Sequence, residues 1–187
     1  MADKRYYMAC LDLDGRACLV VGGGSVGLEK ARGLLDCGAA VTVVAPQIEP
    51  ELQQLPVRWR RRRYQTADLD GMFLVIAATS VSSVNRQVSR DAEARSLLCN
   101  VADVPALCNF ILPAVYRRDP IALAVSTSGA SPALAKRLRD ELGAQIDERH
   151  VDLAHRLHEL RPWVQAHYPS YGGRRDFFEA LVEESLG

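Results

Sequence analysis

The stretch CLVVGGGSVGLEKARGLLDCGAAVTVVAP, residues 18–46, decides the fold of this chain. An apolar run leads directly into three glycines, a segment with helical spacing of its apolar residues follows, and a second apolar run occupies residues 40–44. Short, continuous apolar runs are typical of buried parallel strands, so the stretch predicts a strand, a helix and a second strand. Gly22, Gly24 and Gly27 spell G-x-G-x-x-G between the first strand and the helix, the arrangement that binds the pyrophosphate of a dinucleotide.

The second apolar run ends without the acidic residue that usually accepts the ribose hydroxyls of NAD. The dipeptide Ala45-Pro46 stands there instead, so its backbone and the side chain of Gln47 are predicted to contact the ribose. Glu49 and Glu51 lie too far along the chain to be counted as substitutes. No basic residue at this turn favours a 2′-phosphate, and the arginine run within 58–63 is expected to be a solvated strand edge. These residues leave the choice between NAD and NADP open.

Apolar runs and helix-period segments continue to alternate down to about residue 112. Three further runs are predicted strands, at 57–63, 72–79 and 96–103. The first is expected at a half-exposed edge, and the second, which is the most apolar run of the chain, at the centre of the sheet. This alternation predicts an α/β fold with a parallel, doubly wound sheet.

The pattern changes after Pro113. One strand is predicted at 121–126, followed by a helix that Ser131 caps. The apolar stripe of this helix consists of leucines at helical spacing, Leu134, Leu138 and Leu142. Helices alone are expected from about residue 146, punctuated by Pro162, Pro169 and Gly172-Gly173. A single strand outside a completed sheet has an unpaired edge, which favours pairing with a second subunit.

The composition is that of an ordinary globular protein. The 23 basic side chains match the 23 acidic ones, so net charge indicates neither a nucleic acid nor a membrane as a partner. No apolar run approaches the ~20 residues of a membrane span, and the charged segment 1–19 is not expected to be a signal peptide. Five scattered cysteines predict reduced core side chains in a cytoplasmic protein: Cys10, Cys18, Cys37, Cys99 and Cys108.

The carboxyl ends of the predicted strands nominate the remaining site residues, because ligands of open α/β sheets bind there. Thr79 follows one strand, and Asp103 is the one ionisable side chain at a strand end. Asp103 is expected to be a partly buried general acid or base; the alternative is a turn-forming aspartate before Pro105.

The turn STSGAS, residues 126–131, is the second candidate site. Ser126, Ser128 and Lys136 are predicted to bind an anion at the N-terminus of the following helix, and a simple helix cap is the alternative. Three histidines on a later helix are expected to be solvated rather than metal ligands, His150, His155 and His158.

Taken together, three segments resemble the precorrin-2 dehydrogenase / sirohydrochlorin ferrochelatase family, the dehydrogenase-chelatase portion of siroheme synthase. They are VVGGGSVGLEKARGLLDCGAAVTVVAP, FLVIAATSVSSVNRQVSRDAEARSLLCNVADVP and NFILPAVYRRDPIALAVSTSGASPALAKRLRDEL, and the similarity runs in unbroken order from about residue 6 to residue 145. The resemblance implies NAD-dependent oxidation of precorrin-2 to sirohydrochlorin, in many members followed by insertion of iron or cobalt. It also accounts for the absent acid, since this family binds NAD without one.

The resemblance further implies an architecture and an assembly. A Rossmann-type NAD-binding domain is expected at 1–112, a small α+β dimerisation region at 113–145 and a C-terminal helical region at 146–187. Two such chains are expected to form a homodimer. The methyltransferase domain of siroheme synthases has no room in 187 residues, so a separate enzyme is expected to make precorrin-2.

The resemblance assigns roles residue by residue. The family's key aspartate lies in a C-N-V-x-D-x-P segment, here CNVADVP, which makes Asp103 the catalytic residue. Implied cofactor contacts fall on Ser25, Val26, Pro46 and Gln47. Thr127 stands where some siroheme synthases carry a phosphorylated serine. Six basic residues are candidates for binding the eight carboxylates of precorrin-2: Arg117, Arg118, Lys136, Arg137 and the pair Arg174-Arg175.

A regulatory NAD-sensing module without catalysis is the alternative function. Such a module needs the glycine loop but neither an acid at Asp103 nor a cleft of tetrapyrrole size. Nothing in the sequence identifies a residue for metal insertion or the metal itself.

Overall fold

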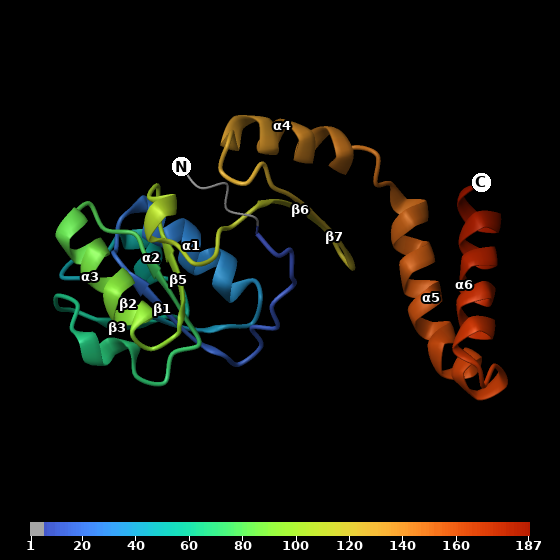
Figure 1. Ribbon diagram of the computed structural model, residues 1–187, viewed down its shortest axis with the longest axis horizontal. Coiled ribbons are helices and arrows are strands. Elements are labelled where there is room, and N and C mark those ends of the chain that lie inside the picture. The colour runs from blue at the N-terminus through green and yellow to red at the C-terminus, as the bar shows by residue number, and fades with distance from the viewer. Residues whose placement is uncertain (1–5) are drawn as a thin grey trace. The chain divides into compact units, whose positions relative to one another are not determined.

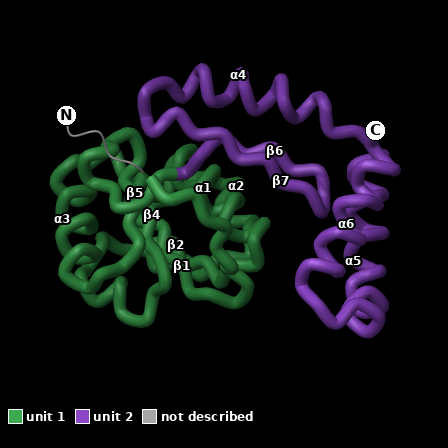
Figure 2. The backbone as a smooth tube through the Cα atoms, turned by 45° about the vertical axis from the view of Figure 1, so that its right-hand side comes forward, with its two compact units in different colours: residues 1–111 green, residues 112–187 purple. Residues whose placement is uncertain are grey.

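The computed structural model describes residues 6–187, and the chain divides into two compact units, Met1–Ile111 and Leu112–Gly187 (Figure 2). The first residues of the charged N-terminal segment, 1–5, lie outside the described part. The predicted split of the second unit at 145/146 and the dimerisation role of 113–145 stay predictions.

The first unit is built on a five-stranded sheet with the order β3-β2-β1-β4-β5, and every pairing in it is parallel. Its strands are β1 (Ala17–Val21), β2 (Ala40–Val44), β3 (Arg58–Arg60), β4 (Leu74–Ala77) and β5 (Leu98–Val101). The strand order reverses between β1 and β4, which is the switch point where doubly wound folds bind ligands. The predicted α/β class is confirmed.

Helices cover both faces of this sheet (Figure 1). They are α1 (Ser25–Leu35), α2 (Pro50–Gln53) and α3 (Ser82–Glu93), with two 3-10 turns, η1 (Thr66–Leu69) and η2 (Pro105–Leu107). Val20 belongs to the apolar cluster that includes Leu34 and Leu52 of α1 and α2, whereas its neighbour Leu19 belongs to the cluster that includes Val88 of α3. Because successive strand residues point to opposite faces, a strand covered on both faces is apolar at every position.

The most apolar run, β4, is an interior strand as predicted, since β1 and β5 lie on either side of it; the middle strand of the five is β1. One expectation about this sheet needs correction. The arginine run does form an edge strand, but only Arg58–Arg60 is extended.

Two guanidinium groups of the arginine run, those of Arg60 and Arg62, converge on one carboxylate. Asp68, which is 1% exposed, accepts hydrogen bonds from Arg60 at 2.6 Å, from Arg62 at 2.6 and 2.8 Å, and from the N–H of Gln65 at 2.9 Å. Burial raises the pKa of Asp68, but the hydrogen bonds from Arg62, Gln65 and Arg60 outweigh it and lower the pKa to about 2. Two of the arginines are therefore occupied within the fold.

The second unit begins with a hairpin that the sequence predicted only in part. Strands β6 (Ala114–Arg118) and β7 (Ile121–Val125) pair antiparallel, so the strand predicted at 121–126 does not stand alone. The first of them was missed because AVYRR ends in two arginines and has little apolar character.

Helix α4 (Pro132–Gly143) packs on this hairpin through its small residues. A Cβ added at Gly143 would lie 2.6 Å from the ring of Tyr116, and Ala135 is buried. The predicted leucine stripe is wrong as a buried face, since Leu134 is 49% and Leu142 42% exposed. The ring of Tyr116 can approach the helix this closely only where no side chain intervenes.

The chain ends in two antiparallel helices, α5 (Glu148–His167) and α6 (Tyr171–Leu186). Pro162 lies inside α5, and Gly172-Gly173 lies in the first turn of α6 behind its cap Ser170. The prediction that these residues interrupt the helices is therefore wrong. No helix in residues 6–187 is long and apolar enough to cross a membrane. None of the five cysteines, all within residues 6–187, forms a disulfide; Cys10 is exposed, contrary to the prediction of a core residue.

Candidate cofactor site at the glycine loop

The glycine loop connects β1 to α1, and packing requires two of its motif glycines. Gly22 has a φ of +126°, and a Cβ there would lie 2.3 Å from the carbonyl oxygen of Ala78. A Cβ at Gly27 would lie 2.3 Å from the carbonyl oxygen of Gly22. Real Cβ atoms do not come this close to backbone, so the loop folds this way only with glycine at both positions.

Gly23, which lies outside the G-x-G-x-x-G positions, is also required by packing. A Cβ there would lie 2.2 Å from the carbonyl oxygen of Gln47 and 2.5 Å from the side chain of Ile48. The N–H of Glu49 donates to the carbonyl of Gly23 at 2.8 Å. The segment after β2 therefore folds back onto the glycine loop, and the three consecutive glycines were the signal for this close approach.

Gly24 differs from its neighbours because it faces open space. No atom lies within 4 Å of a Cβ built on it, and it is the N-cap of α1 without a side-chain hydrogen bond. The first amides of a helix have no partner within the helix and carry its positive end. Ser25 and Val26, both exposed, provide such amides, so this helix end fits the pyrophosphate of a dinucleotide.

A cavity of about 380 Å³ joins the glycine loop to the segment after β2. Its lining consists of Gly23, Gly24, Gln47, Ile48 and Glu49. Gln47 lies where the sequence placed it, and Pro46 is exposed beside it. Glu49 was discounted for its distance along the chain, yet the fold brings it to the same cavity.

Thr79 lies at the carboxyl end of β4, and a buried asparagine holds it in place. Its hydroxyl donates to Oδ1 of Asn85 at 2.7 Å, and Nδ2 of Asn85 donates to the carbonyl of Thr79 at 2.9 Å. Asn85 is 6% exposed and was missed; a polar residue on the apolar face of α3 was the signal. Because Gly22 abuts Ala78, the loop around Thr79 and the glycine loop are packed against each other.

Asp103 follows β5 at the same carboxyl edge of the sheet and is exposed, so the partial burial expected of it is not found. Its φ is +60°, a left-handed conformation that costs a non-glycine residue about 1 kcal/mol. Buried Cys108 holds the turn in place, since its sulfur accepts from the N–H of Val101 at 3.1 Å and lies 3.4 Å from the carbonyl oxygen of Val104. Strain of this kind is frequent at functional sites.

The predicted anion-binding turn belongs to the second unit. Oγ of Ser126 accepts from the N–H of Ser128, whose φ is +53°, and Oγ of Ser131 caps α4. The hydroxyl of Thr127 accepts from the N–H of Ser131 and donates to its carbonyl, both at 3.0 Å. Lys136 is exposed.

Four of the basic residues expected to bind substrate carboxylates already have partners in the second unit. Arg118 donates to Glu148 at 2.5 Å and to the carbonyl of Ile146 at 2.7 Å. Arg174 donates to two carbonyls in the turn between α5 and α6. The other two are paired with acids on their own helices, Arg137 with Glu141 and Arg175 with Asp176.

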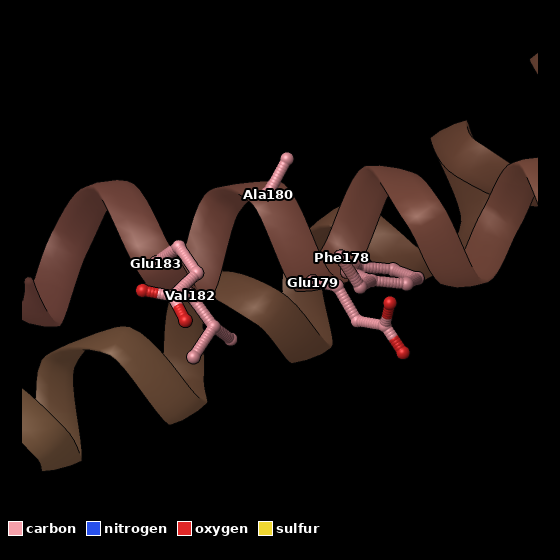
Figure 3. A pocket seen from close by; sticks show the side chains of 5 residues that line it. All are labelled: Phe178, Glu179, Ala180, Val182 and Glu183. Atoms are coloured by element: carbon pink, nitrogen blue, oxygen red, sulfur yellow. The ribbon is translucent and has the colours of Figure 1, made fainter.

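The remaining candidates are the histidines of α5 and a hollow along α6. Nδ1 of His150 lies 2.7 Å from Asp147, and residues 6–187 contain no group of three side chains able to hold a metal ion. A hollow of about 510 Å³ runs along α6 (Figure 3). All of its lining comes from that one helix, Phe178, Glu179, Ala180, Val182 and Glu183, and includes no predicted site residue.

The comparisons with known proteins agree with this geometry. Residues 9–114 match a family model described as NAD(P)-binding, and residues 118–145 match the model of the sirohaem biosynthesis protein central region. The chain is 46% identical over 175 residues to the siroheme synthase of Pseudomonas entomophila and 41% identical over 185 residues to that of Chromobacterium violaceum. These alignments cover 91% and 97% of this chain but 38% and 39% of the relatives.

A solved structure covers nearly the whole chain. The structure of SirC, precorrin-2 dehydrogenase, superposes with a TM-score of 0.79 at 31% sequence identity. The match includes 97% of this chain and 93% of the other. Both units are thus represented in one relative of the same extent, and the chain belongs to the family of precorrin-2 dehydrogenases and the matching portion of siroheme synthases.

Proposed function

We propose that this chain is an NAD-dependent dehydrogenase that oxidises precorrin-2 to sirohydrochlorin. The observation that carries the proposal is the likeness to SirC, precorrin-2 dehydrogenase, which includes 93% of that chain. The glycine loop and the open N-terminus of α1 support a dinucleotide cofactor independently of that likeness. Insertion of iron or cobalt stays a prediction; addition of either metal ion to the sirohydrochlorin product tests it.

Oxidation of precorrin-2 removes a hydride from one carbon and a proton from the macrocycle. NAD, when bound, supplies the hydride acceptor. The amides at the start of α1 hold the pyrophosphate of NAD. The loop around Thr79, which Asn85 holds in place, forms the neighbouring wall of the cofactor site. We assign the proton to Asp103, an exposed carboxylate at the carboxyl edge of the sheet.

Substrate contacts are proposed in the second unit. Ser126, Ser128 and Lys136 lie at or near the N-terminus of α4, where helix amides and an ammonium group favour carboxylates. The carboxylates of precorrin-2 are the groups that such residues would bind.

A direct assay separates the proposed function from the NAD-sensing alternative. Purified chain, NAD and enzymatically made precorrin-2 are mixed, and the absorption spectrum is followed. Conversion to the spectrum of sirohydrochlorin with matching formation of NADH is expected. Binding of NAD without any conversion supports the sensing module instead.

Gly24→Asp tests the cofactor assignment without disturbing the fold. The new side chain points into open space in the free protein, but brings bulk and a negative charge to the expected position of the pyrophosphate. The Kd for NAD should rise at least about tenfold, or 1.4 kcal/mol. Gly33→Asp, on an open face of the same helix, is the control and should leave the Kd unchanged. An unaltered NAD titration of folded Gly24→Asp would remove the dinucleotide assignment.

We also propose a homodimer, held through the second unit. Its apolar side chains remain exposed in the single chain, with Val115 at 37%, Leu134 at 49% and Leu142 at 42%. A two-stranded hairpin with one helix is marginal by itself and gains stability from a partner. Light scattering at micromolar concentration should yield twice the 20.6 kDa of one chain, and a monomer mass would contradict the proposal. Cysteines that form no disulfide, three of them buried, support a cytoplasmic location.

A further inference from the structure

The end of β2 lacks a carboxylate that could bind the cofactor's ribose. Ala45 is buried, and its carbonyl accepts from the indole N–H of Trp59 at 2.9 Å. The hydroxyls of an adenosine ribose need an acceptor in this neighbourhood, and carboxylates are the usual one. A carboxylate from another position must therefore reach the cavity, or the ribose is held by backbone and amide groups alone.

Glu49 is the carboxylate that the fold brings there. Its N–H is anchored on the carbonyl of Gly23 at 2.8 Å, and its neighbour Ile48 is buried under the glycine loop. It lines the cavity of about 380 Å³ together with Gly23, Gly24 and Gln47. The backbone of Glu49 is thus held beside the loop that receives the pyrophosphate.

The Glu49 side chain is also chemically available. Across residues 6–187 its carboxylate has no hydrogen bond or ion pair, whereas that of Glu51 accepts from Arg32 at 2.8 Å. In the arginine run after β2, Arg60 and Arg62 are bound to Asp68 and are therefore not available to neutralise Glu49.

We propose that Glu49 accepts the hydrogen bonds of the adenosine ribose hydroxyls and thereby favours NAD over NADP. The inference rests on the proposed function only for the binding of NAD. A carboxylate accepts from two vicinal hydroxyls and repels a 2′-phosphate, so one residue supplies both the affinity and the discrimination. Glu49 thus takes the place of the acid absent from the end of β2.

The test uses Glu49→Gln and Glu51→Gln in the full chain, with NAD and NADP titrated separately by calorimetry. Glu49→Gln removes one charge at nearly constant shape. It should raise the Kd for NAD about tenfold, while the Kd for NADP stays constant or falls. Glu51→Gln loses its pairing with Arg32 and should change neither Kd more than twofold. Glu49→Ala should behave like Glu49→Gln, with an unfolding midpoint equal to that of the original chain.

Three results would overturn the inference. They are equal binding of NAD and NADP by the original chain, an unchanged Kd for NAD in folded Glu49→Gln, and equal weakening of both cofactors in that variant. Each differs from failure of the proposed function, in which the original chain binds no dinucleotide at all or Gly24→Asp binds NAD as before.

Discussion

Replacement of Asp103 by asparagine is expected to reduce the rate of precorrin-2 oxidation at least about a hundredfold. The amide retains the size and shape of the side chain and one acceptor oxygen, but it cannot take up a proton at neutral pH. A well-placed general base contributes about 10²–10⁴-fold to a rate, which sets the expected loss. Single-turnover formation of sirohydrochlorin, followed by absorption, measures it.

The interpretation of this variant depends on three controls. Asp103→Asn should bind NAD with the Kd of the original chain, show the same mass in solution and unfold at the same midpoint. These are reasonable expectations because Asp103 is exposed and the Cys108 sulfur, not the Asp103 side chain, holds the turn. A folded variant that oxidises precorrin-2 at nearly the original rate would show that Asp103 takes no part in the proton transfer.

The largest expected effect on stability is that of Gly22→Ala. A Cβ at Gly22 would lie 2.3 Å from the carbonyl oxygen of Ala78, and the φ of +126° is unfavourable for any L side chain. Overpacking costs about 1–3 kcal/mol and the backbone conformation about 1–2 kcal/mol, so the free energy of unfolding should fall by about 3 kcal/mol. Urea unfolding followed by circular dichroism measures this change.

Gly24→Ala is the matched control for Gly22→Ala. The same methyl group, two residues further along, meets no atom within 4 Å and has a φ of −83°. Its unfolding midpoint should stay close to that of the original chain. Similar midpoints for both variants would contradict the close packing of the loops after β1 and β4.

Local pattern alone was sufficient for the first unit. Strand β2 occupies residues 40–44 as predicted, and α1 lies between the glycine loop and β2, where a helix was predicted. These elements can be predicted from the sequence because helices cover both faces of the sheet. Each strand is therefore a short apolar run between turn residues. Where cover is incomplete, at the β3 edge, the predicted strand was too long.

In the second unit, packing between the elements determined the structure, and the local sequence pattern gave wrong or incomplete predictions. The leucines of α4 have the spacing of a buried helical face. The hairpin nevertheless packs against the small residues Ala135 and Gly143. Strand β6 exists because β7 pairs with it residue for residue, from Ala114↔Val125 to Arg118↔Ile121. Hydrogen bonding between strands is not encoded in the apolar content of either one.

The features of the candidate site also fall into those set by local sequence and those set by tertiary structure. The sequence by itself determined the glycine loop, the absence of an acid after β2 and the position of Asp103 at a strand end, because each is a local property of a strand terminus. Only the tertiary structure decided that Gly23 is needed, that Asn85 holds Thr79 and that Glu49 lines the cavity. The contacts of Gly23 and Glu49 join segments that lie far apart along the chain, and they arise only when parallel strands bring their carboxyl ends to one edge of the sheet.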